Sequence, residues 1–321
     1  MHGPGPTVHV VSPNPAQDRL QVVPRLVVGE VHRATEVVSR PGGKGMIVAR
    51  GVVRLGGRAA LHGFLGGPVG AQISEGCREL GIEDRHVRVD GETRVNTVLV
   101  DATSGSSTVV NEPGPQVATA AVEALVEGLL GAVARGDTVV CTGSLPRGVA
   151  PDLYARCVRE LRGHGVRTVV DTSGAALALA VRAAPDVLKV NEQELRADSG
   201  LAEEDDGADL DTLMRHVLDA GVGAVVVTRG ADGLSYRSAA EAWDVTTPAV
   251  RVVNATGSGD LMLAGFVTAL ARGEDVETAL RTGAAAGAAN AARLEPDLGG
   301  PDEVHELRTR AVATAVAAVR R

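Results

Sequence analysis

The spacing of hydrophobic residues changes along the chain, and each spacing predicts a different element. Short apolar runs, most of them rich in valine, predict buried β-strands at 7–12, 58–64, 137–142, 166–171, 186–190 and 223–228. Helical spacing predicts helices at 45–55, 70–80, 117–134, 150–163, 174–183, 209–220, 260–272 and 276–293. Strands that alternate with helices form mainly parallel sheets with both faces covered. The pattern therefore predicts an α/β fold with three layers, α/β/α.

Other segments do not fit this series. Alternating β-branched residues at 20–38 and a hairpin pattern around Ser104-Gly105 predict a small β-sheet lid, formed by approximately 18–40 and 94–112. Residues 233–247 also resemble a hairpin, and residues 303–321 are predicted to form a terminal helix. The acidic segment 203–211 is expected to be a solvated surface loop. Since no linker or repeat interrupts the chain, residues 1–321 are predicted to form a single domain.

Composition narrows the possible functions. The chain has 321 residues and a net charge of −8, which disfavours nucleic-acid binding. No apolar run reaches the length of about 18 residues that a membrane span needs. The N-terminus lacks the pattern of a signal peptide. Because the three cysteines show neither metal-ligand spacing nor a disulfide pattern, we expect a cytoplasmic protein.

The most informative segment is Ala255-Thr-Gly-Ser-Gly-Asp260, which joins a β-branched run to a helix. Its small residues allow backbone N–H groups to point at one spot, and the helix dipole adds positive potential there. A carboxylate at such an anion site suits a base that takes a proton from a hydroxyl attacking a γ-phosphoryl group. The alternative for Asp260 is an ordinary aspartate in the first turn of a capped helix.

Lysine occurs at only two positions, Lys44 and Lys189, whereas every other basic residue is arginine or histidine. Lys44 lies in a glycine-rich turn, and Lys189 lies beside an Asn/Glu cluster. Because an ammonium group is a compact point charge, both positions could handle phosphate; chance survival in an arginine-rich composition is the alternative. Ligands bind beyond the carboxyl ends of parallel strands, and five polar loops are predicted there: 142–146, 171–173, 191–194, 228–231 and 256–260.

Seven motifs occur in an order that resembles the phosphofructokinase B group of ribokinase-like sugar kinases, with most similarity to 1-phosphofructokinases and tagatose-6-phosphate kinases. The likeness covers roughly residues 7–295. The motifs are Asn14-Pro-Ala-Gln-Asp18, Pro41-Gly-Gly-Lys-Gly45, Glu92-Thr-Arg94, Asn111-Glu-Pro-Gly-Pro115, Thr142-Gly-Ser-Leu-Pro146, Asn191-x-x-Glu194 and Ala255-Thr-Gly-Ser-Gly-Asp260. The resemblance implies a ribokinase-like fold and a kinase that uses ATP and Mg²⁺.

The resemblance also implies roles on the nucleotide side. Asp260 would be the catalytic base, and the amides of Gly257, Ser258 and Gly259 would stabilise the transferred phosphoryl group. Asn191 and Glu194 would organise Mg²⁺ and its waters; a capping box at the start of a helix is the alternative for their local geometry. The other nucleotide-side residues implied are Lys189, Thr228, Gly230, Asp232 and, near the adenine, Asn290.

On the acceptor side, Asp18 would accept hydrogen bonds from sugar hydroxyls, and Gly42 and Gly43 would let the backbone approach the sugar. A phosphate already on the substrate would be held by Arg33, Lys44, Arg94 and Ser144. Three cations suit an anionic acceptor through charge-assisted bonds. The alternative is that Arg33 and Arg94 are exposed lid residues in weak surface pairs. The resemblance further implies a homodimer formed through the lid, because unpaired strand edges invite pairing.

One departure from the family pattern affects the acceptor. Where the family usually has Asn in Gly-Gly-Lys-Gly-Ile-Asn-Val, this chain has Ile47, which cannot bond a sugar hydroxyl. The first hypothesis is a kinase of a phosphorylated ketohexose such as fructose 1-phosphate or tagatose 6-phosphate. The second is a kinase of another acceptor, non-phosphorylated or a specialised metabolite. The third is a ligand-binding protein without turnover. A dinucleotide-binding dehydrogenase is disfavoured because Pro13-Asn-Pro15 stands where its glycine fingerprint should be.

Overall fold

The computed structural model describes residues 5–198 and 208–316, which form a ten-stranded sheet, a four-stranded sheet and a two-stranded pair. The strands of the large sheet are β1 (Thr7–Val11), β4 (Arg58–His62), β6 (Glu83–Asp84), β10 (Thr138–Thr142), β11 (Arg167–Asp171), β12 (Val187–Asn191), β13 (Ala224–Thr228), β14 (Leu234–Ser238), β15 (Ala242–Val245) and β16 (Ala313–Ala315). Their spatial order is β16-β15-β14-β13-β12-β11-β10-β1-β4-β6. Strands β13 to β6 in that order are parallel, and β14, β15 and β16 are antiparallel.

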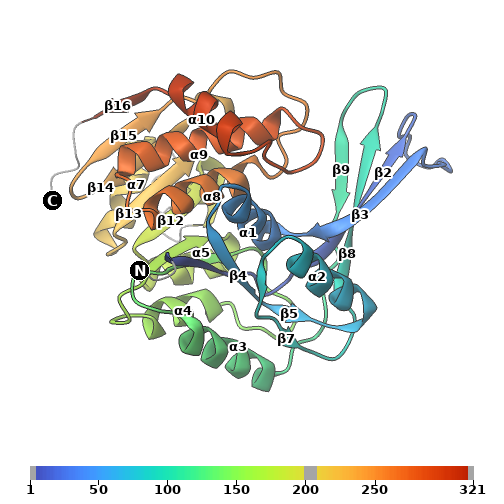
Figure 1. The fold of residues 1–321 in the computed structure, drawn as a ribbon, viewed down its shortest axis with the longest axis horizontal. Coiled ribbons are helices and arrows are strands. Elements are labelled where there is room, and N and C mark those ends of the chain that lie inside the picture. The colour runs from blue at the N-terminus through green and yellow to red at the C-terminus, as the bar shows by residue number, and fades with distance from the viewer. Residues whose placement is uncertain (1–4, 199–207, 317–321) are drawn as a thin grey trace.

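Helices cover both faces of this sheet, so the predicted three-layer architecture is confirmed (Figure 1). One layer contains α1 (Lys44–Arg54), α2 (Gly67–Glu79), α8 (Ser258–Ala271), α9 (Val276–Ala291) and α10 (Pro301–Arg310). The other contains α3 (Thr119–Ala132), α4 (Leu153–Glu160), α5 (Gly174–Arg182), α6 (Glu192–Asp198) and α7 (Leu210–Asp219). Along β1, Val8 and Val10 belong to one hydrophobic core and Val11 to the other, as the two-residue period of a strand requires.

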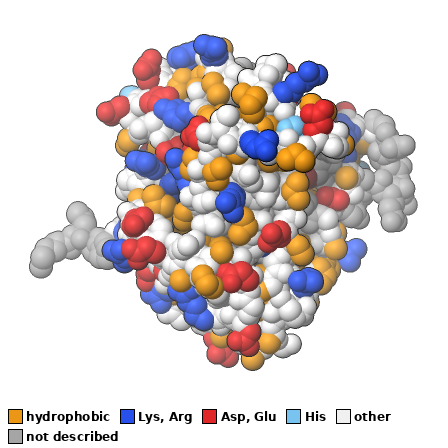
Figure 2. Space-filling model, turned by 90° about the vertical axis from the view of Figure 1, so that its right-hand side faces the viewer, with side chains coloured by type: hydrophobic (Ala, Val, Ile, Leu, Met, Phe, Trp, Pro, Cys, Tyr) orange, Lys and Arg blue, Asp and Glu red, His pale blue; other side chains and the backbone are white. Residues whose placement is uncertain are grey.

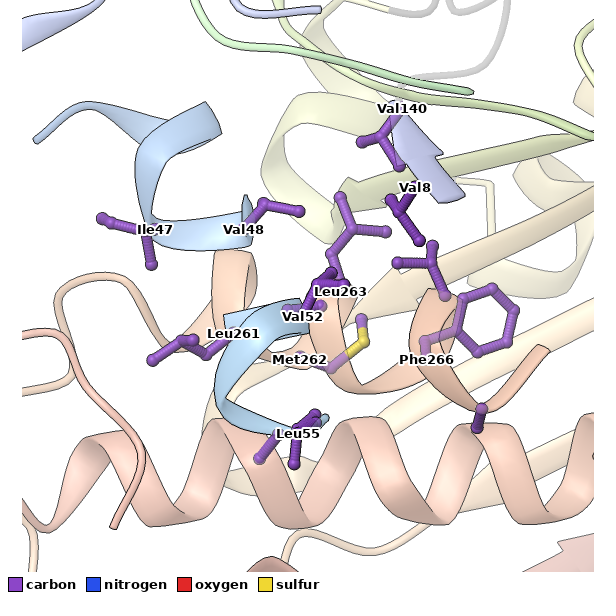
Figure 3. Packing of buried hydrophobic residues seen from close by; sticks show 14 of the residues in the cluster. Val8, Ile47, Val48, Val52, Leu55, Val140, Leu261, Met262, Leu263 and Phe266 are labelled. Atoms are coloured by element: carbon purple, nitrogen blue, oxygen red, sulfur yellow. The ribbon is translucent and has the colours of Figure 1, made fainter. Parts of the chain in front are cut away.

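Close packing of α1 against α8 determines where two candidate residues lie. Val48 and Val52 of α1, with Leu55 directly after it, pack toward the side chains of α8 (Figure 3). A Cβ atom at Gly51 would lie 2.6 Å from atoms of Ala264 and Leu261, so only glycine permits this approach. Since α1 begins at Lys44 and α8 carries Asp260 in its first turn, the helix contact fixes these two residues relative to each other.

The predicted lid is a separate sheet that projects from one side of the molecule (Figure 1). Its strands are β2 (Ala16–Val23), β3 (Glu36–Gly42), β8 (Arg94–Asp101) and β9 (Ser107–Val110), in the order β3-β2-β8-β9. The remaining pair is β5 (Phe64–Leu65) and β7 (Val87–Arg88). Seen from the lid side, hydrophobic side chains lie among charged ones over much of the surface (Figure 2).

Two predictions of local structure were wrong. The predicted terminal helix ends at Arg310, and Ala313–Ala315 instead pair with β15 as strand β16. Of the predicted acidic loop, residues 203–207 lie outside the described residues, but Asp209 caps α7 and Asp211 belongs to that helix, where it pairs with Arg237. Among the described residues, no helix is long and apolar enough to cross a membrane.

Candidate active site

The turn before α8 has the backbone geometry of an anion site. Gly257 has φ 82°, in the left-handed region, and a Cβ atom there would lie 2.9 Å from Pro296 Cβ. The amide of Asn290 holds this turn, since its Nδ2 donates to Thr256 O and Ser258 Oγ, each at 2.9 Å. The positive end of the α8 dipole therefore lies at a backbone turn that a buried amide keeps in place.

Asp260 lies in the first turn of α8 and is only 7% exposed. Burial raises the pKa of its carboxyl group to about 7. The nearby charges oppose one another: Lys44 and Lys189 lower this pKa, whereas Asp171 and Glu194 raise it. A carboxyl group with a pKa near neutrality is matched to proton transfer at physiological pH.

Asp171, at the end of β11, brings the two lysines of the chain together. Its Oδ2 lies 3.2 Å from Lys189 Nζ, and its Oδ1 lies 3.7 Å from Lys44 Nζ. Asp171 is fully buried, and the Asp171 carboxylate is the main cause of the raised pKa of Lys44. Lys189 Nζ also borders the glycine turn, because a Cβ atom on Gly259 would lie 3.2 Å from it. Both ammonium groups therefore lie near the start of α8.

Asn191 and Glu194 form a reciprocal capping box at the start of α6. Glu194 N donates to Asn191 Oδ1 at 2.7 Å, and Asn191 N donates to Glu194 Oε2 at 2.9 Å. The capping box, which was the alternative explanation for the spacing of Asn191 and Glu194, is thus present in the structure. It leaves Glu194 Oε1 outside the capping interaction, and the charge of Glu194 acts on both Lys44 and Asp260. The box positions a carboxylate oxygen beside the charged cluster.

A cavity of about 670 Å³ lies on the other side of the glycine turn. Its walls include Thr228, Gly230, Ser258, Gly259, Met262 and Ala288. None of its lining residues is charged. The hydroxyls that line it are already engaged: Thr228 with Val190 O, Thr247 with Gly230 O, and Ser258 with Asn290. This mostly apolar cavity has the size of a small-molecule site and reaches the turn that holds Asp260.

On the lid side of the site, Asp18 is held in a fixed orientation. Its Oδ1 accepts a hydrogen bond from Asn96 Nδ2 at 3.0 Å, and its Oδ2 accepts one from Gly43 N at 3.3 Å. Burial raises the pKa of Asp18, and the two hydrogen bonds oppose that shift. A Cβ atom on Gly42 would lie 2.0 Å from Asp18 Oδ2. Glycine at this position is therefore required by the close approach of the carboxylate.

Of the residues predicted to hold the phosphate of the acceptor, only some lie close together. Arg94 Nε and Nη2 donate to Asn14 O, its Nη1 donates to Glu112 O, and its charge acts on Asp18. Ser144 is near these residues, because its Oγ accepts a hydrogen bond from Asn14 Nδ2. Arg33 does not join them. Arg33 is exposed in the connection between β2 and β3. Val22, near the end of β2, is already roughly 14 Å along the strand from Asp18, and Arg33 lies further along the chain.

Three other predicted site residues have surroundings that the sequence did not indicate. Lys44 was expected around the acceptor phosphate, but its ammonium group pairs with Asp171 and interacts with Asp260. Asn290 was expected near the adenine, but it is fully buried and does not line the cavity. Asp232 is exposed in the short 3₁₀ helix Gly230–Asp232 and does not line the cavity either. For Lys44 and Asn290, an ion pair and hydrogen bonds with distant segments decide the placement.

Sequence reasoning assigned no role to Asp171, Asn96 or Asn14. Asp171 did lie in a loop selected for its position at the end of a predicted strand, which was the one available signal. Asn96 was placed in a lid strand, where nothing local shows that it bonds Asp18. Among the described residues, no group of three or more His, Cys, Asp or Glu could hold a metal ion directly.

The chain is similar to known carbohydrate kinases over most of its length. Residues 15–299 match the pfkB family carbohydrate kinases. The chain is 33% identical over 314 residues to a 1-phosphofructokinase of Rhodobacter capsulatus, covering 96% of this chain and 98% of that protein. It is 29% identical over 300 residues to a 1-phosphofructokinase of Bacillus subtilis, covering 94% and 97%.

Solved structures show the same fold. The crystal structure of phosphofructokinase-2 from Escherichia coli in complex with fructose-6-phosphate has a TM-score of 0.85, with 26% identity over 94% of this chain and 98% of the other. A ribokinase from Thermotoga maritima has a TM-score of 0.79 with 24% identity over 94% and 99%, a likeness that concerns the fold alone.

Proposed function

Because the chain belongs to the pfkB family of carbohydrate kinases, we propose that it transfers the γ-phosphoryl group of ATP to a hydroxyl of a phosphorylated ketohexose. The acceptor would be of the fructose 1-phosphate or tagatose 6-phosphate type. The names of the relatives support this choice, since those of R. capsulatus and B. subtilis are 1-phosphofructokinases. The grouping of Lys44, Lys189, Asp171 and Glu194 around the carboxyl group of Asp260 supports the proposal.

The observation that carries the proposal is Asp260 at the glycine-lined start of α8. Its pKa of about 7 leaves a large fraction ionised at neutral pH. In this state it accepts the proton of the acceptor hydroxyl as the oxygen attacks the γ-phosphorus. The amides of Gly257 and Gly259 stabilise the charge on the transferred group, together with the ammonium groups of Lys44 and Lys189, whereas the amide of Ser258 already donates to Ala255 O at 3.1 Å.

The donor side would hold ATP with its base in the apolar cavity and its phosphates toward the turn. Glu194 fits an indirect role toward Mg²⁺ through its second carboxylate oxygen, with Asn191 holding the cap that orients it. When bound, Mg²⁺ would neutralise phosphate charge. Asn191 and Glu194 would bind it through water, as the absence of a three-ligand cluster among the described residues suggests.

On the acceptor side, the Asp18 carboxylate would accept hydrogen bonds from sugar hydroxyls. Asn96 and Gly43 leave its remaining lone pairs for the substrate. Arg94 would bind the acceptor phosphate with the donors that its two backbone carbonyl partners leave free. The lid sheet would then form one wall of the acceptor site and exclude water during transfer.

A coupled ATP-turnover assay across ketohexose phosphates, free sugars and nucleosides tests the proposal. We expect turnover with a phosphorylated ketohexose. Asp260→Asn should lower kcat by about 10²- to 10⁴-fold while nucleotide still binds, because only the proton acceptor is lost. Turnover stimulated only by non-phosphorylated acceptors would refute the proposed acceptor class. Unchanged turnover in Asp260→Asn would refute the assigned base.

Ile47 supports a second candidate, a kinase of the same family with a different acceptor. Ile47 is 7% exposed, and a Cβ atom on Gly257 would lie 3.5 Å from its Cδ1. An aliphatic group thus borders the catalytic turn where the family usually has an amide. If Ile47 excludes common ketose phosphates, Ile47→Asn should raise their kcat/KM. An unchanged selectivity across the acceptor panel would remove Ile47 from the specificity determinants.

We also propose that two copies associate through the lid. The register places Val38, Leu20, Val98 and Val109 in one row across all four strands, and Val109 is 44% exposed. Such a row of aliphatic side chains on a projecting sheet favours burial by a second copy. Val109→Asp should convert a dimer to a monomer in light scattering, whereas Thr108→Asp on the opposite face should not. A wild-type monomer would refute the proposal.

A cytoplasmic location is also part of this proposal. The three cysteines, Cys77, Cys141 and Cys157, are all buried and unpaired. Free thiols fit a reducing compartment, which is also where ATP is available to a kinase.

A further inference from the structure

Asp171 contacts both lysines of the chain, and the proposed function assigns it no role. It is 0% exposed at the end of β11, and its two carboxylate oxygens face different lysines. Lys44 opens α1 directly after the glycines that border Asp18, and Lys189 lies in β12 beside Gly259. One lysine thus comes from the acceptor side and the other from the nucleotide side. A single buried carboxylate joins the two halves of the site.

The two oxygens of the Asp171 carboxylate differ in their hydrogen bonds. Its Oδ2 accepts a hydrogen bond from Lys189 Nζ at 3.2 Å, but its Oδ1 has no hydrogen-bond partner, and Lys44 Nζ lies 3.7 Å from it. A buried charge that lacks a full set of hydrogen bonds costs stability. Replacement by an apolar residue would not relieve that cost, because Lys189, only 4% exposed, would then be a buried charge without its partner. Asp171 is thus the carboxylate on which both lysines converge next to Asp260.

We propose that Asp171 is a positioning residue, which holds the ammonium groups of Lys44 and Lys189 on either side of the transferred phosphoryl group and balances their charge next to Asp260. This role rests on the proposed kinase function. Without Asp171, the two ammonium groups would lose the carboxylate that contacts both of them, and only the charges of Asp260 and Glu194 would remain beside Lys44. The ammonium groups would repel each other, and neither would have a fixed position when the phosphates arrive.

The charges around Asp260 give this role a measurable consequence. The groups that act on it are Lys44 of α1, Asp171 of β11, Lys189 of β12 and Glu194 of α6. Removing the charge of Asp171 leaves the two lysines in excess, which stabilises ionised Asp260 and lowers its pKa. A carboxylate with a lower pKa is a weaker base. The same change frees the ammonium groups to bind phosphate before the reaction begins, and such ground-state binding does not accelerate transfer.

Three variants test the proposal. Asp171→Asn should lower kcat about 100-fold, a loss expected when charged groups are misplaced by about 1 Å. It should leave the KM for ATP unchanged or lower, and it should move the acid limb of the pH profile to lower pH. Lys44→Met should move that limb the opposite way, because Lys44 lowers the pKa of Asp260. The double variant Asp171→Asn/Lys44→Met should return the limb toward its wild-type position, because the net charge is restored.

Asp137→Asn is the matched control. Asp137 is also buried and hydrogen-bonded, but it lies at the opposite end of the neighbouring strand β10, where it accepts bonds from Thr7 N and Ala134 N. This variant should lower stability without moving the pH profile. If Asp171→Asn also leaves the acid limb unmoved, or if it raises the KM for ATP in proportion to the loss of kcat, a positioning role is refuted.

A second measurement separates this proposal from the proposed function. The pKa of Asp260 can be followed without turnover, by carboxyl NMR of protein labelled with ¹³C-aspartate, using the signal that Asp260→Asn removes. We expect that signal to titrate at lower pH in Asp171→Asn and at higher pH in Lys44→Met. If no acceptor is phosphorylated but the signal moves as expected, the charge balance stands and the kinase assignment fails. If turnover is found but the signal stays in place, the role of Asp171 fails.

Discussion

Replacing Asp260 with asparagine should stabilise the fold while it removes activity. Burial raises the pKa of this carboxyl group from 3.8 to about 7. At 1.36 kcal/mol per pH unit, the ionised carboxylate costs the native state about 4 kcal/mol at most. Asparagine has nearly the same shape and carries no charge. At pH 8, the free energy of unfolding should therefore rise by up to about 4 kcal/mol in Asp260→Asn.

The pH dependence of this gain follows from the direction of the pKa change. Between pH 3.8 and about 7, native Asp260 holds a proton that the unfolded chain has released. The wild-type free energy of unfolding therefore falls as the pH rises through this window. Asparagine does not titrate. The advantage of the variant should thus be near zero around pH 4, grow through the window and reach its full value above pH 7.

Urea unfolding of ligand-free protein at pH 5, 6, 7 and 8 measures this difference. Asp275→Asn is the control, because Asp275 is an exposed N-cap of α9 whose pKa is lowered by the bond from Thr278 N. Its replacement should not stabilise the fold at pH 8. A gain in Asp260→Asn that is absent at pH 8, or equal at pH 5 and pH 8, would contradict the electrostatic cost assigned to Asp260.

Three further predictions follow from the site and the core. Arg94→Ala should raise the KM for a phosphorylated acceptor more than it lowers kcat, and an unchanged acceptor KM in steady-state kinetics would remove Arg94 from the phosphate site. The hydroxyls of the apolar cavity already form hydrogen bonds within the protein, so kcat/KM for ATP and GTP should differ by less than about 100-fold. A larger preference would show that backbone groups select the base. Burial lowers the pKa of His62 to about 3, so stability should fall below pH 6.5 by about 1.4 kcal/mol per pH unit as the unfolded chain takes up the proton. His62→Gln should show a shallower loss of melting temperature between pH 7 and pH 5, and equal slopes would contradict this origin.

The sequence predicted most strands of the central sheet because their signals are local, but it indicated neither β6 nor β16. The valine-rich runs that became β10 to β13 are buried on both faces, and a strand of this kind has the same hydrophobic pattern wherever it pairs. The C-terminal segment shows the limit of such reasoning. Its alanines and valines suit a helix as well as a strand, and pairing with β15 decides the outcome at Ala313–Ala315. That partner is about 70 residues away, so no local pattern could reveal it.

The candidate site was predictable where a residue type is chemically unusual in its place. Asp260 is unusual because it is a carboxylate in a glycine turn, and Lys44 and Lys189 are unusual because they are the two lysines of the chain. The partners of these residues were not predictable. Asp171 pairs with Lys44, which lies 127 residues earlier in the chain. The side-chain amide of Asn290 donates a hydrogen bond to Thr256 O. A hydrogen bond of this kind leaves no trace in the spacing of either residue, so Asn290 was assigned to the adenine when it holds the turn instead.

The presence of lysine at these two positions, in a chain that otherwise uses arginine, follows from the geometry of Asp171. Each of its carboxylate oxygens has room for one ammonium nitrogen, and the Lys189 nitrogen lies so close to the glycine turn that even a single methyl group on Gly259 would approach to 3.2 Å. A guanidinium group is planar, larger and able to bind one carboxylate through two donors. An arginine at position 189 would therefore collide with the turn or occupy both oxygens of Asp171 and displace Lys44. The compact charge of lysine allows one carboxylate to hold a cation from each half of the proposed site.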